Sequence, residues 1–241
     1  MTKASKHRLP ELRVAITGGT SGLGLALVEL LSSHGARVAF CARVARRVAE
    51  VERDHPGTHG IVADVSDKQA IHPLAMRFVA ALDGLDVLIN NVSSLGPVPL
   101  ATLADTECED LKRAFETNVM APFRLTRALL GALAASSRER GVAAVVNISS
   151  DAAVSPYPNW GAYGASKAAL AHLTRIWHAE LVGEGIRFLS IDPGDMDTPL
   201  HALAVPDADP ATLRRPDDAA AEIVERLLEI LYVTSSLPEP A

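Results

Sequence analysis

Short apolar runs alternate with longer amphipathic runs along the chain. Six apolar runs of strand length occupy residues 13–17, 37–42, 60–63, 85–90, 142–148 and 186–191. Helical spacing of apolar residues occurs at residues 25–31, twice within 104–133, at 163–182 and at 219–231. Strands that alternate with helices form a parallel sheet that is covered by helices on both faces. The pattern therefore predicts a doubly wound α/β fold.

The chain is long enough for one large domain. Its 241 residues can bury a sizeable core, which we expect to extend over residues 12–231. Residues 200–215 contain prolines and alternating acids, so this stretch is predicted to be an irregular, mobile substrate loop. The end of the chain, residues 233–241, is predicted to fray.

Three positions carry signals for the limits of helices. Pro216, followed by two acids, predicts the first turn of the last helix, where proline and negative charge are favourable. Ser66 is predicted to cap the helix after the third strand. Pro122 lacks a main-chain donor, so it is predicted to disturb the helix just after Asn118.

Composition narrows the class of protein. The net charge of −6 and the pI near 5.7 argue against nucleic acid and anionic membranes as partners. The apolar run after the basic N-terminus is too short to span a membrane. Cys41 and Cys108 lie far apart and the histidines are scattered, so we expect neither a disulfide framework nor a metal site. These features favour a soluble protein of the reducing cytoplasm.

A glycine-rich turn joins the first strand to the first helix. The turn contains Gly18, Thr20, Ser21, Gly22, Leu23 and Gly24. Such a turn brings main-chain N–H groups and the positive end of a helix to a pyrophosphate, with no Cβ in the way. A tight turn for close packing is the alternative, but the flanking strand and helix favour nucleotide binding.

The second strand ends without an acidic residue. Dinucleotide folds that prefer NAD usually carry Asp or Glu there, whereas Arg accommodates the 2′-phosphate of NADP. Ala42 stands at this position and Arg43 follows it. We therefore expect NADP(H), with Arg43 on the 2′-phosphate and Arg46 or Arg47 assisting. The alternative is that these arginines only solvate a helix face.

Polar residues also follow the third and fourth strands. Asp64, next to Val65, is placed either to bind the adenine amino group or to shape a turn. Asn90 and Asn91 end the fourth strand, where their amides can fix a loop against a cofactor. Ligands of such sheets bind outside the carboxyl ends of the strands, so we expect these residues at one site.

Tyr163 and Lys167 lie one turn apart on a predicted helix. Residues at i and i+4 share a helix face, so we expect the Lys167 ammonium to lower the pKa of the phenol by stabilising its anion. Such a phenol can act as an acid or a base. The pair alone is also typical of an exposed helix face, but Ser150 lies thirteen residues before Tyr163.

Together these motifs resemble the short-chain dehydrogenase/reductase family over about residues 12–231, and the combination is far more specific than any part. The family's glycine motif matches residues 17–24, and its strand-four motif matches Asn90 and Asn91. Its catalytic tetrad matches Asn118, Ser150, Tyr163 and Lys167. Pro193, Gly194 and Thr198 match its motif beside the nicotinamide.

The resemblance implies a single Rossmann-like domain that binds a nicotinamide cofactor. Tyr163 would exchange a proton with the substrate oxygen while Ser150 holds that oxygen. Lys167 would bind the nicotinamide ribose and lower the pKa of Tyr163, and the main chain at Asn118 would hold a water of the proton path. The implied cofactor contacts are Gly18, Thr20, Ser21, Gly22, Leu23, Gly24, Arg43, Asp64, Val65, Asn91, Val92, Tyr163, Lys167, Pro193, Gly194, Met196 and Thr198.

The strand-four motif departs from the family pattern. The family usually continues with Ala-Gly, whereas this chain has Val92 and Ser93. We expect these larger side chains to crowd the floor beside the nicotinamide and to change the shape of the substrate pocket.

Five further side chains are candidates for the substrate side. Asp151 and Asp195 either select a cationic or polyhydroxyl substrate or form local caps and turns. Tyr157 and Trp160 either line an aromatic wall or pack within their loop. His201 is placed to face the substrate.

These features predict NADPH-dependent reduction of a ketone or aldehyde, or the reverse oxidation, without a metal. One alternative is a reductase of 3-oxoacyl chains on a carrier protein, with Arg124, Arg127, Arg214 and Arg215 as candidate contacts. Another is an NADP(H)-binding sensor without turnover, which the intact tetrad argues against. The resemblance also implies a homodimer or homotetramer built on the helices that hold Asn118 and Tyr163.

Overall fold

The structure, a computed structural model, describes residues 12–232. Its strands are β1 (Arg13–Thr17), β2 (Arg37–Ala42), β3 (His59–Val62), β4 (Val87–Asn90), β5 (Ala144–Ile148) and β6 (Arg187–Ile191). Its helices are α1 (Gly22–Ser33), α2 (Ala45–Asp54), α3 (Ile71–Leu82), α4 (Cys108–Phe115), α5 (Ala121–Arg140), α6 (Gly161–Leu181), α7 (Pro199–Ala204) and α8 (Pro216–Tyr232). The predicted frayed end, residues 233–241, lies outside the described residues.

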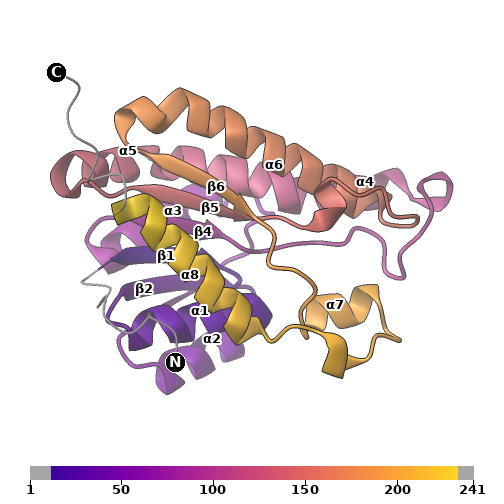
Figure 1. The fold of residues 1–241 in the computed structure, drawn as a ribbon. Helices are drawn as coiled ribbons and strands as arrows, with labels where there is room; N and C mark the ends of the chain where they lie inside the picture. Colours follow the sequence, from indigo (N-terminus) through magenta and orange to yellow (C-terminus); the bar gives the residue numbers. More distant parts are fainter. Residues whose placement is uncertain (1–11, 233–241) are drawn as a thin grey trace.

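The six strands form one parallel sheet in the order β3-β2-β1-β4-β5-β6 (Figure 1). The predicted starts of the strands differ from the observed ones by at most two residues. The strand order reverses between β1 and β4, and ligands bind beside such a reversal at the carboxyl ends of the strands. The doubly wound, Rossmann-like prediction is confirmed.

Helices cover both faces of the sheet. α1, α2 and α8 pack on one face, and α3, α5 and α6 pack on the other (Figure 1). Val14 and Ile16 of β1 belong to the first hydrophobic cluster and Ala15 to the second, because successive side chains of a strand point to opposite faces. Burial on both faces explains why the central strands β1, β4 and β5 are largely apolar.

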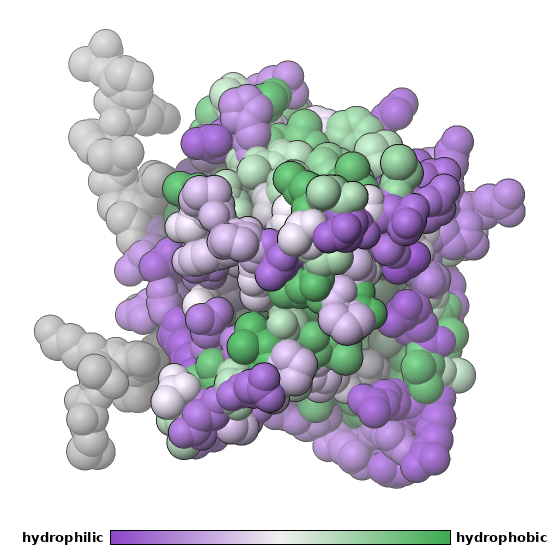
Figure 2. Space-filling model, turned by 90° about the vertical axis from the view of Figure 1, so that its right-hand side faces the viewer, coloured by the Kyte–Doolittle hydropathy of each residue, from purple (hydrophilic) through white to green (hydrophobic). Residues whose placement is uncertain are grey.

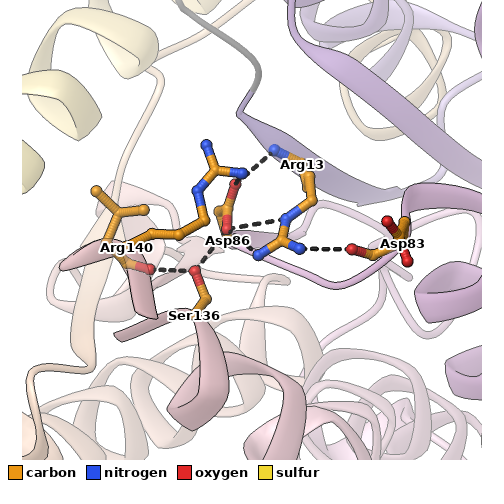
Figure 3. A network of polar contacts seen from close by, with 6 residues as sticks. Arg13, Asp83, Asp86, Ser136 and Arg140 are labelled. Atoms are coloured by element: carbon orange, nitrogen blue, oxygen red, sulfur yellow. Dashed lines mark hydrogen bonds and ion pairs between the residues drawn. The ribbon is translucent and has the colours of Figure 1, made fainter. Parts of the chain in front are cut away.

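A buried carboxylate lies just before the amino end of β4. Asp86 accepts hydrogen bonds from the main-chain N of Arg13 (2.9 Å) and from its Nη2 (2.7 Å). The Ser136 hydroxyl of α5 also donates to it, and Arg140 forms an ion pair with it at 3.5 Å (Figure 3). The network joins β1, β4 and α5 at the edge opposite the carboxyl ends of the strands, and the sequence analysis did not identify it.

The prediction of an irregular loop over residues 200–215 was wrong for its first part. α7 begins at Pro199, and a 3-10 turn follows at Pro210–Thr212. The Thr198 hydroxyl accepts a hydrogen bond from the main-chain N of His201 (3.2 Å). A capping Thr followed by Pro is a helix start, and the sequence analysis overlooked it.

The prediction that Ser66 caps a helix was also wrong, because α3 begins at Ile71. Ser66 instead donates to the Asp64 carboxylate from its main-chain N (2.9 Å) and its hydroxyl (2.7 Å). These two hydrogen bonds form a turn in which a carboxylate takes the place of a main-chain acceptor.

The predicted disturbance near Pro122 is confirmed. A π-helical turn, Glu116–Met120, connects α4 to α5, and the main-chain N of Ala121 donates to the carbonyl of Glu116, five residues earlier. Pro122 has no N–H for the carbonyl of Asn118, four residues before it. The wide turn accommodates this loss and places Asn118 in the interior, where it is fully buried.

Candidate active site

A cavity of about 1030 Å³ runs along the carboxyl edge of the sheet. All of the predicted cofactor contacts line it, and so does Ser150. Asn118 is the one member of the predicted tetrad that does not. Figure 2 faces this edge, where apolar side chains gather near the middle and hydrophilic ones surround them. The volume is sufficient for a dinucleotide together with a small substrate.

The glycine turn fits a bound pyrophosphate. A Cβ at Gly24 would lie 2.0 Å from the carbonyl oxygen of Gly18, so only glycine permits the approach of α1 to the turn. Gly22 has φ of +50°, in the left-handed region that favours glycine. The first N–H groups of α1, which have no partner within the helix, come from residues that line the cavity.

The end of β2 presents cations rather than an acid. Arg43 and Arg47 line the cavity beside Ala42. Arg46 lies outside it and pairs with Glu50 (2.8 Å) on the surface of α2. Of the two predicted auxiliaries, only Arg47 therefore reaches the cavity.

The two asparagines after β4 have different partners. The Asn91 amide nitrogen donates to the carbonyl of Thr17 (2.9 Å), so Asn91 fixes the start of the glycine turn. Asn90 is buried, and its amide nitrogen donates to the Asn147 side chain of β5 (2.8 Å). Asn147 in turn donates to Thr174 of α6 (2.8 Å). Asn90 therefore links elements of the core and does not line the cavity.

Tyr163 is buried and lines the cavity. Burial raises the pKa of Tyr163 to about 12, because the charged phenolate is poorly solvated. The neighbouring Ser150 hydroxyl lowers this pKa, and the carboxylates of Asp192, Asp151 and Asp195 raise it. The indole of Trp160 packs edge-on against the phenol, with ring centroids 5.6 Å apart.

The pKa of Tyr163 is raised and not lowered as expected, and Lys167 is not among the groups that shift it. Lys167 is 1% exposed, and burial lowers its own pKa to about 7, which weakens it as a source of positive charge. Its Nζ lies 5.5 Å from the centroid of the Tyr163 ring. It donates to the carbonyl of Ile148 (2.7 Å) and to the hydroxyl of Ser93 (2.6 Å).

The Asn118 side chain holds the loop after β4. Its Oδ1 accepts from the main-chain N of Ser94 (2.7 Å), and its Nδ2 donates to the carbonyl of Ser94 (2.8 Å). The same nitrogen donates to the Ser166 hydroxyl of α6 (2.8 Å). The π-helical turn thus joins the loop after β4 to the helix that carries Tyr163 and Lys167.

Acidic and aromatic side chains line the cavity near Tyr163. Asp151 accepts hydrogen bonds from the hydroxyls of Ser150 (3.1 Å) and Tyr157 (2.6 Å). Its carboxylate therefore makes local contacts, which agrees with the predicted alternative of a local cap or turn. His201 lines the cavity 3.9 Å from Asp195. Within residues 12–232, His201 Nδ1 is a buried polar atom that has no hydrogen-bond partner.

Two polar residues of the site were not predicted from the sequence. Ser93 stood out only as a departure from a motif, and no role was expected for Asp192, which acts electrostatically on both Tyr163 and Lys167. The family usually has glycine at the position of Ser93, and this difference was the available signal that the residue has a role. Asp192 directly follows β6, so its position at a strand end was the available signal.

Other kinds of site find no support in the described part of the chain. No group of three or more His, Cys, Asp or Glu side chains in residues 12–232 is arranged to hold a metal. Cys41 and Cys108 are both free. No helix in this same range has the length and apolar character needed to cross a bilayer.

Comparison with known proteins identifies the family. The family described as short chain dehydrogenase matches residues 13–209. A short chain dehydrogenase of Pseudocercospora fijiensis is 35% identical over 196 residues, which cover 78% of this chain and only 60% of that protein. A short chain dehydrogenase structure from Pseudomonas syringae is 31% identical, with a TM-score of 0.85, and the match covers 98% of this chain and 96% of that chain.

A short chain dehydrogenase structure from Shigella flexneri, complexed with NADP, is 25% identical with a TM-score of 0.81. That match covers 94% of this chain and 93% of the Shigella chain. The protein therefore belongs to the short-chain dehydrogenase/reductase family. This is a family of dehydrogenases, which are oxidoreductases.

Proposed function

We propose that the protein catalyses the NADPH-dependent reduction of a ketone or aldehyde and the reverse oxidation of the alcohol. The observation that carries the proposal is the convergence of Tyr163, Ser150 and Lys167 in the cavity that the glycine turn also lines. A bound nicotinamide would supply or accept the hydride. The side chains of this chain would orient the carbonyl and move the proton.

Tyr163 is suited to donate that proton. A pKa near 12 keeps the phenol protonated at neutral pH, which is the form that reduction requires. The Ser150 hydroxyl lies close enough to the phenol to lower its pKa, so a carbonyl oxygen that meets both groups would be held next to its proton donor. Lys167 carries three N–H donors. Ser93 and Ile148 occupy two of them among the described residues, and the third is suited to a ribose hydroxyl.

The preference for NADP(H) rests on the end of β2. Solved structures with this fold are described with NADP and with NADH, so the fold does not decide between the cofactors. Arg43 and Arg47 line the cavity, and Ala42 supplies no carboxylate for ribose hydroxyls. A 2′-phosphate would meet two cations here. Steady-state kinetics with both cofactors test the preference, and equal efficiency with NADH would contradict it.

The rim of the cavity favours an uncharged, largely apolar carbonyl compound. Val98, Leu203 and Val205 line the cavity and are exposed. Exposed apolar side chains around a pocket are typical of a binding surface. Asp151 and Asp195 at the same end would repel an anionic substrate such as a 2-oxoacid.

The carrier-protein alternative has less support. Arg124 pairs with Glu116, Arg214 with Glu222, and Arg215 with Asp217. Three of the four arginines that were candidates for docking an acidic carrier are therefore already paired with acids. The sensor alternative leaves unexplained why a proton donor, its hydrogen-bond partner and a buried ammonium meet in one cavity.

The experiment that tests this function is the replacement Tyr163→Phe. Activity is assayed by the loss of NADPH absorbance with a panel of ketones, aldehydes and 2-oxoacids. Removal of a general acid lowers turnover roughly 100- to 10,000-fold, while NADPH binding, followed by its fluorescence, should persist. Tyr157→Phe is the matched control and should lose far less activity, since its hydroxyl bonds to Asp151 at the exposed rim. Full activity of Tyr163→Phe would refute the mechanism.

We also expect a homodimer or homotetramer of the cytoplasm. Leu111, Met120 and Ile176 are exposed on α4, the π-helical turn and α6, and burial of such side chains favours association. A monomer mass in light scattering would reject the oligomer.

A further inference from the structure

The buried ammonium of Lys167 has an acceptor that is not part of the catalytic tetrad. Its Nζ lies 2.6 Å from the hydroxyl of Ser93 and 2.7 Å from the carbonyl of Ile148. A buried charge is costly unless hydrogen bonds satisfy it. The Ile148 carbonyl belongs to β5 and is present whatever side chain occupies that position. The Ser93 hydroxyl is the side-chain partner, and a glycine at position 93 would not provide it.

Ser93 stands on a short segment that is held on both sides. Before it, the main-chain N of Val92 donates to the Thr17 hydroxyl (3.2 Å). After it, both main-chain polar groups of Ser94 are bonded to the Asn118 side chain, at 2.7 and 2.8 Å. A hydroxyl presented between two fixed residues loses little conformational freedom when it binds its partner. The acceptor is therefore preorganised for Lys167.

We propose that Ser93 is a positioning residue that holds the Lys167 ammonium in its working place, and that the Asn118 side chain supports it by fixing the loop. The inference rests on the proposed function for the role of Lys167 in the reaction. It gives Ser93, in the motif that follows β4, a role beyond narrowing the floor of the pocket. It also gives the Asn118 side chain a task that is separate from any role of its main chain.

The surroundings of Lys167 determine in which direction its pKa should change when Ser93 is replaced. Two ionisable groups face it, namely Tyr163 on the same helix and Asp192 after β6. Burial lowers the pKa of Lys167 to about 7, and Asp192 raises it. Ser93 and Ile148 are neutral acceptors that stabilise the charged form. Loss of the Ser93 oxygen should therefore lower the pKa of Lys167 further.

The first test observes Lys167 directly. The chain contains five lysines, so the protein labelled with ¹³C at the lysine ε-carbon gives few NMR signals, and Lys167→Met identifies the one of interest. We expect this signal to titrate well below the other four. In Ser93→Ala, its midpoint should fall by about one to two pH units, the size expected for a lost hydrogen bond to a charged group.

Two further variants control for changes in the loop. Ser93→Thr keeps the hydroxyl and should keep the midpoint of the unaltered protein. Ser94→Ala removes the neighbouring hydroxyl, which bonds to the main-chain N of Gly96 (3.3 Å) and not to Lys167, so its midpoint should also stay unchanged. If Ser93→Ala fails to fold, Ser93→Cys replaces it, because a thiol is a weak acceptor. An unchanged Lys167 midpoint in a folded Ser93→Ala would overturn the proposal.

The second test measures the reaction. In Ser93→Ala, the alkaline limb of the pH profile of kcat/KM for NADPH should move to lower pH, and Ser93→Thr should restore it. An unmoved limb in Ser93→Ala would contradict the positioning role. The NMR titration needs no turnover, so a protein that reduced no carbonyl at all would refute the proposed function and still leave the contact between Ser93 and Lys167 measurable.

Discussion

Two side chains of the site, one a potential anion and one a potential cation, are both shifted toward their neutral forms. Burial raises the pKa of Tyr163 to about 12 and lowers that of Lys167 to about 7. Both shifts have the same cause, since a charge inside the protein lacks the solvation that water provides. The Ser150 hydroxyl lowers the pKa of Tyr163, and the hydrogen bonds that Lys167 donates to Ser93 and Ile148 favour its charged form, so both limit the shifts. The residues around the pair therefore decide at which pH it works.

Asp151 is one of three carboxylates whose charge acts on the phenol of Tyr163. Its carboxylate raises the pKa of Tyr163, so Asp151→Asn should lower that pKa. The phenolate that alcohol oxidation requires would then form at lower pH, and reduction would lose its proton donor at lower pH. We expect the alkaline transition of kcat to move down by up to about one pH unit in both directions of the reaction.

The control for this prediction is Asp207→Asn, which removes an exposed charge that does not act on Tyr163. It should leave the transition in place. A transition that stayed unmoved in Asp151→Asn, or that moved equally in the control, would show that Asp151 does not tune the phenol.

At the scale of elements, the site depends on places where regular structure is interrupted. The glycine turn lets α1 approach β1 closely, and the π-helical turn before Pro122 buries Asn118 against α6. α7 begins at a Thr–Pro cap and brings Leu203 to the rim of the cavity. Each interruption follows from one or two residues that regular helix or strand geometry does not accommodate.

Gly24→Ala tests the first of these interruptions. The added Cβ would lie 2.0 Å from the Gly18 carbonyl oxygen, so the turn must move and cofactor binding should be lost or weakened at least 10-fold. Gly131→Ala is the matched control in α5, where an added Cβ meets nothing within 4 Å. It should keep binding and raise stability by up to about 1 kcal/mol. NADPH fluorescence titration and thermal unfolding provide the two readouts, and normal binding by Gly24→Ala would contradict the fit.

At the scale of the whole molecule, the two edges of the sheet have different tasks. The carboxyl edge holds the cavity, and the amino edge holds the network of Asp86 with Arg13, Ser136 and Arg140 (Figure 3). Asp86 is fully buried and joins the start of two central strands to α5. Such a network supports the fold without contact with the reaction.

Asp86→Ala should therefore reduce stability and spare activity. Removing one partner of a buried ion pair costs about 3–5 kcal/mol, and urea unfolding should show a loss of this size. Removal of an exposed ion pair, Arg46→Ala beside Glu50, should cost far less, because solvent screens the two charges. At a temperature where Asp86→Ala remains folded, its kcat should match that of the unaltered protein. A loss of activity larger than the unfolded fraction would place Asp86 in the function.

Much of the fold could be predicted from local patterns. Central strands that are buried on both faces are largely apolar, and Pro216 marks the start of α8, so the order of the strands and of most helices was predicted without the structure, although α7 was not. The lining of the cavity could also be predicted, because parallel strands bring their carboxyl ends to one edge whatever the details of packing. Thr198 and Pro199 show that local signals can be overlooked as well, since both were visible in the sequence.

The sequence by itself determined the alternation of strands and helices, the glycine turn, and the family to which the motifs belong. Those features depend on residues close together in the chain, where spacing alone indicates geometry. Only the tertiary structure decided that Ser93 meets Lys167, that Asn118 holds Ser94, and that the pKa of Tyr163 rises. These outcomes depend on burial and on partners 24 to 74 residues apart in the chain. Desolvation and long-range contacts exist only once the chain is folded.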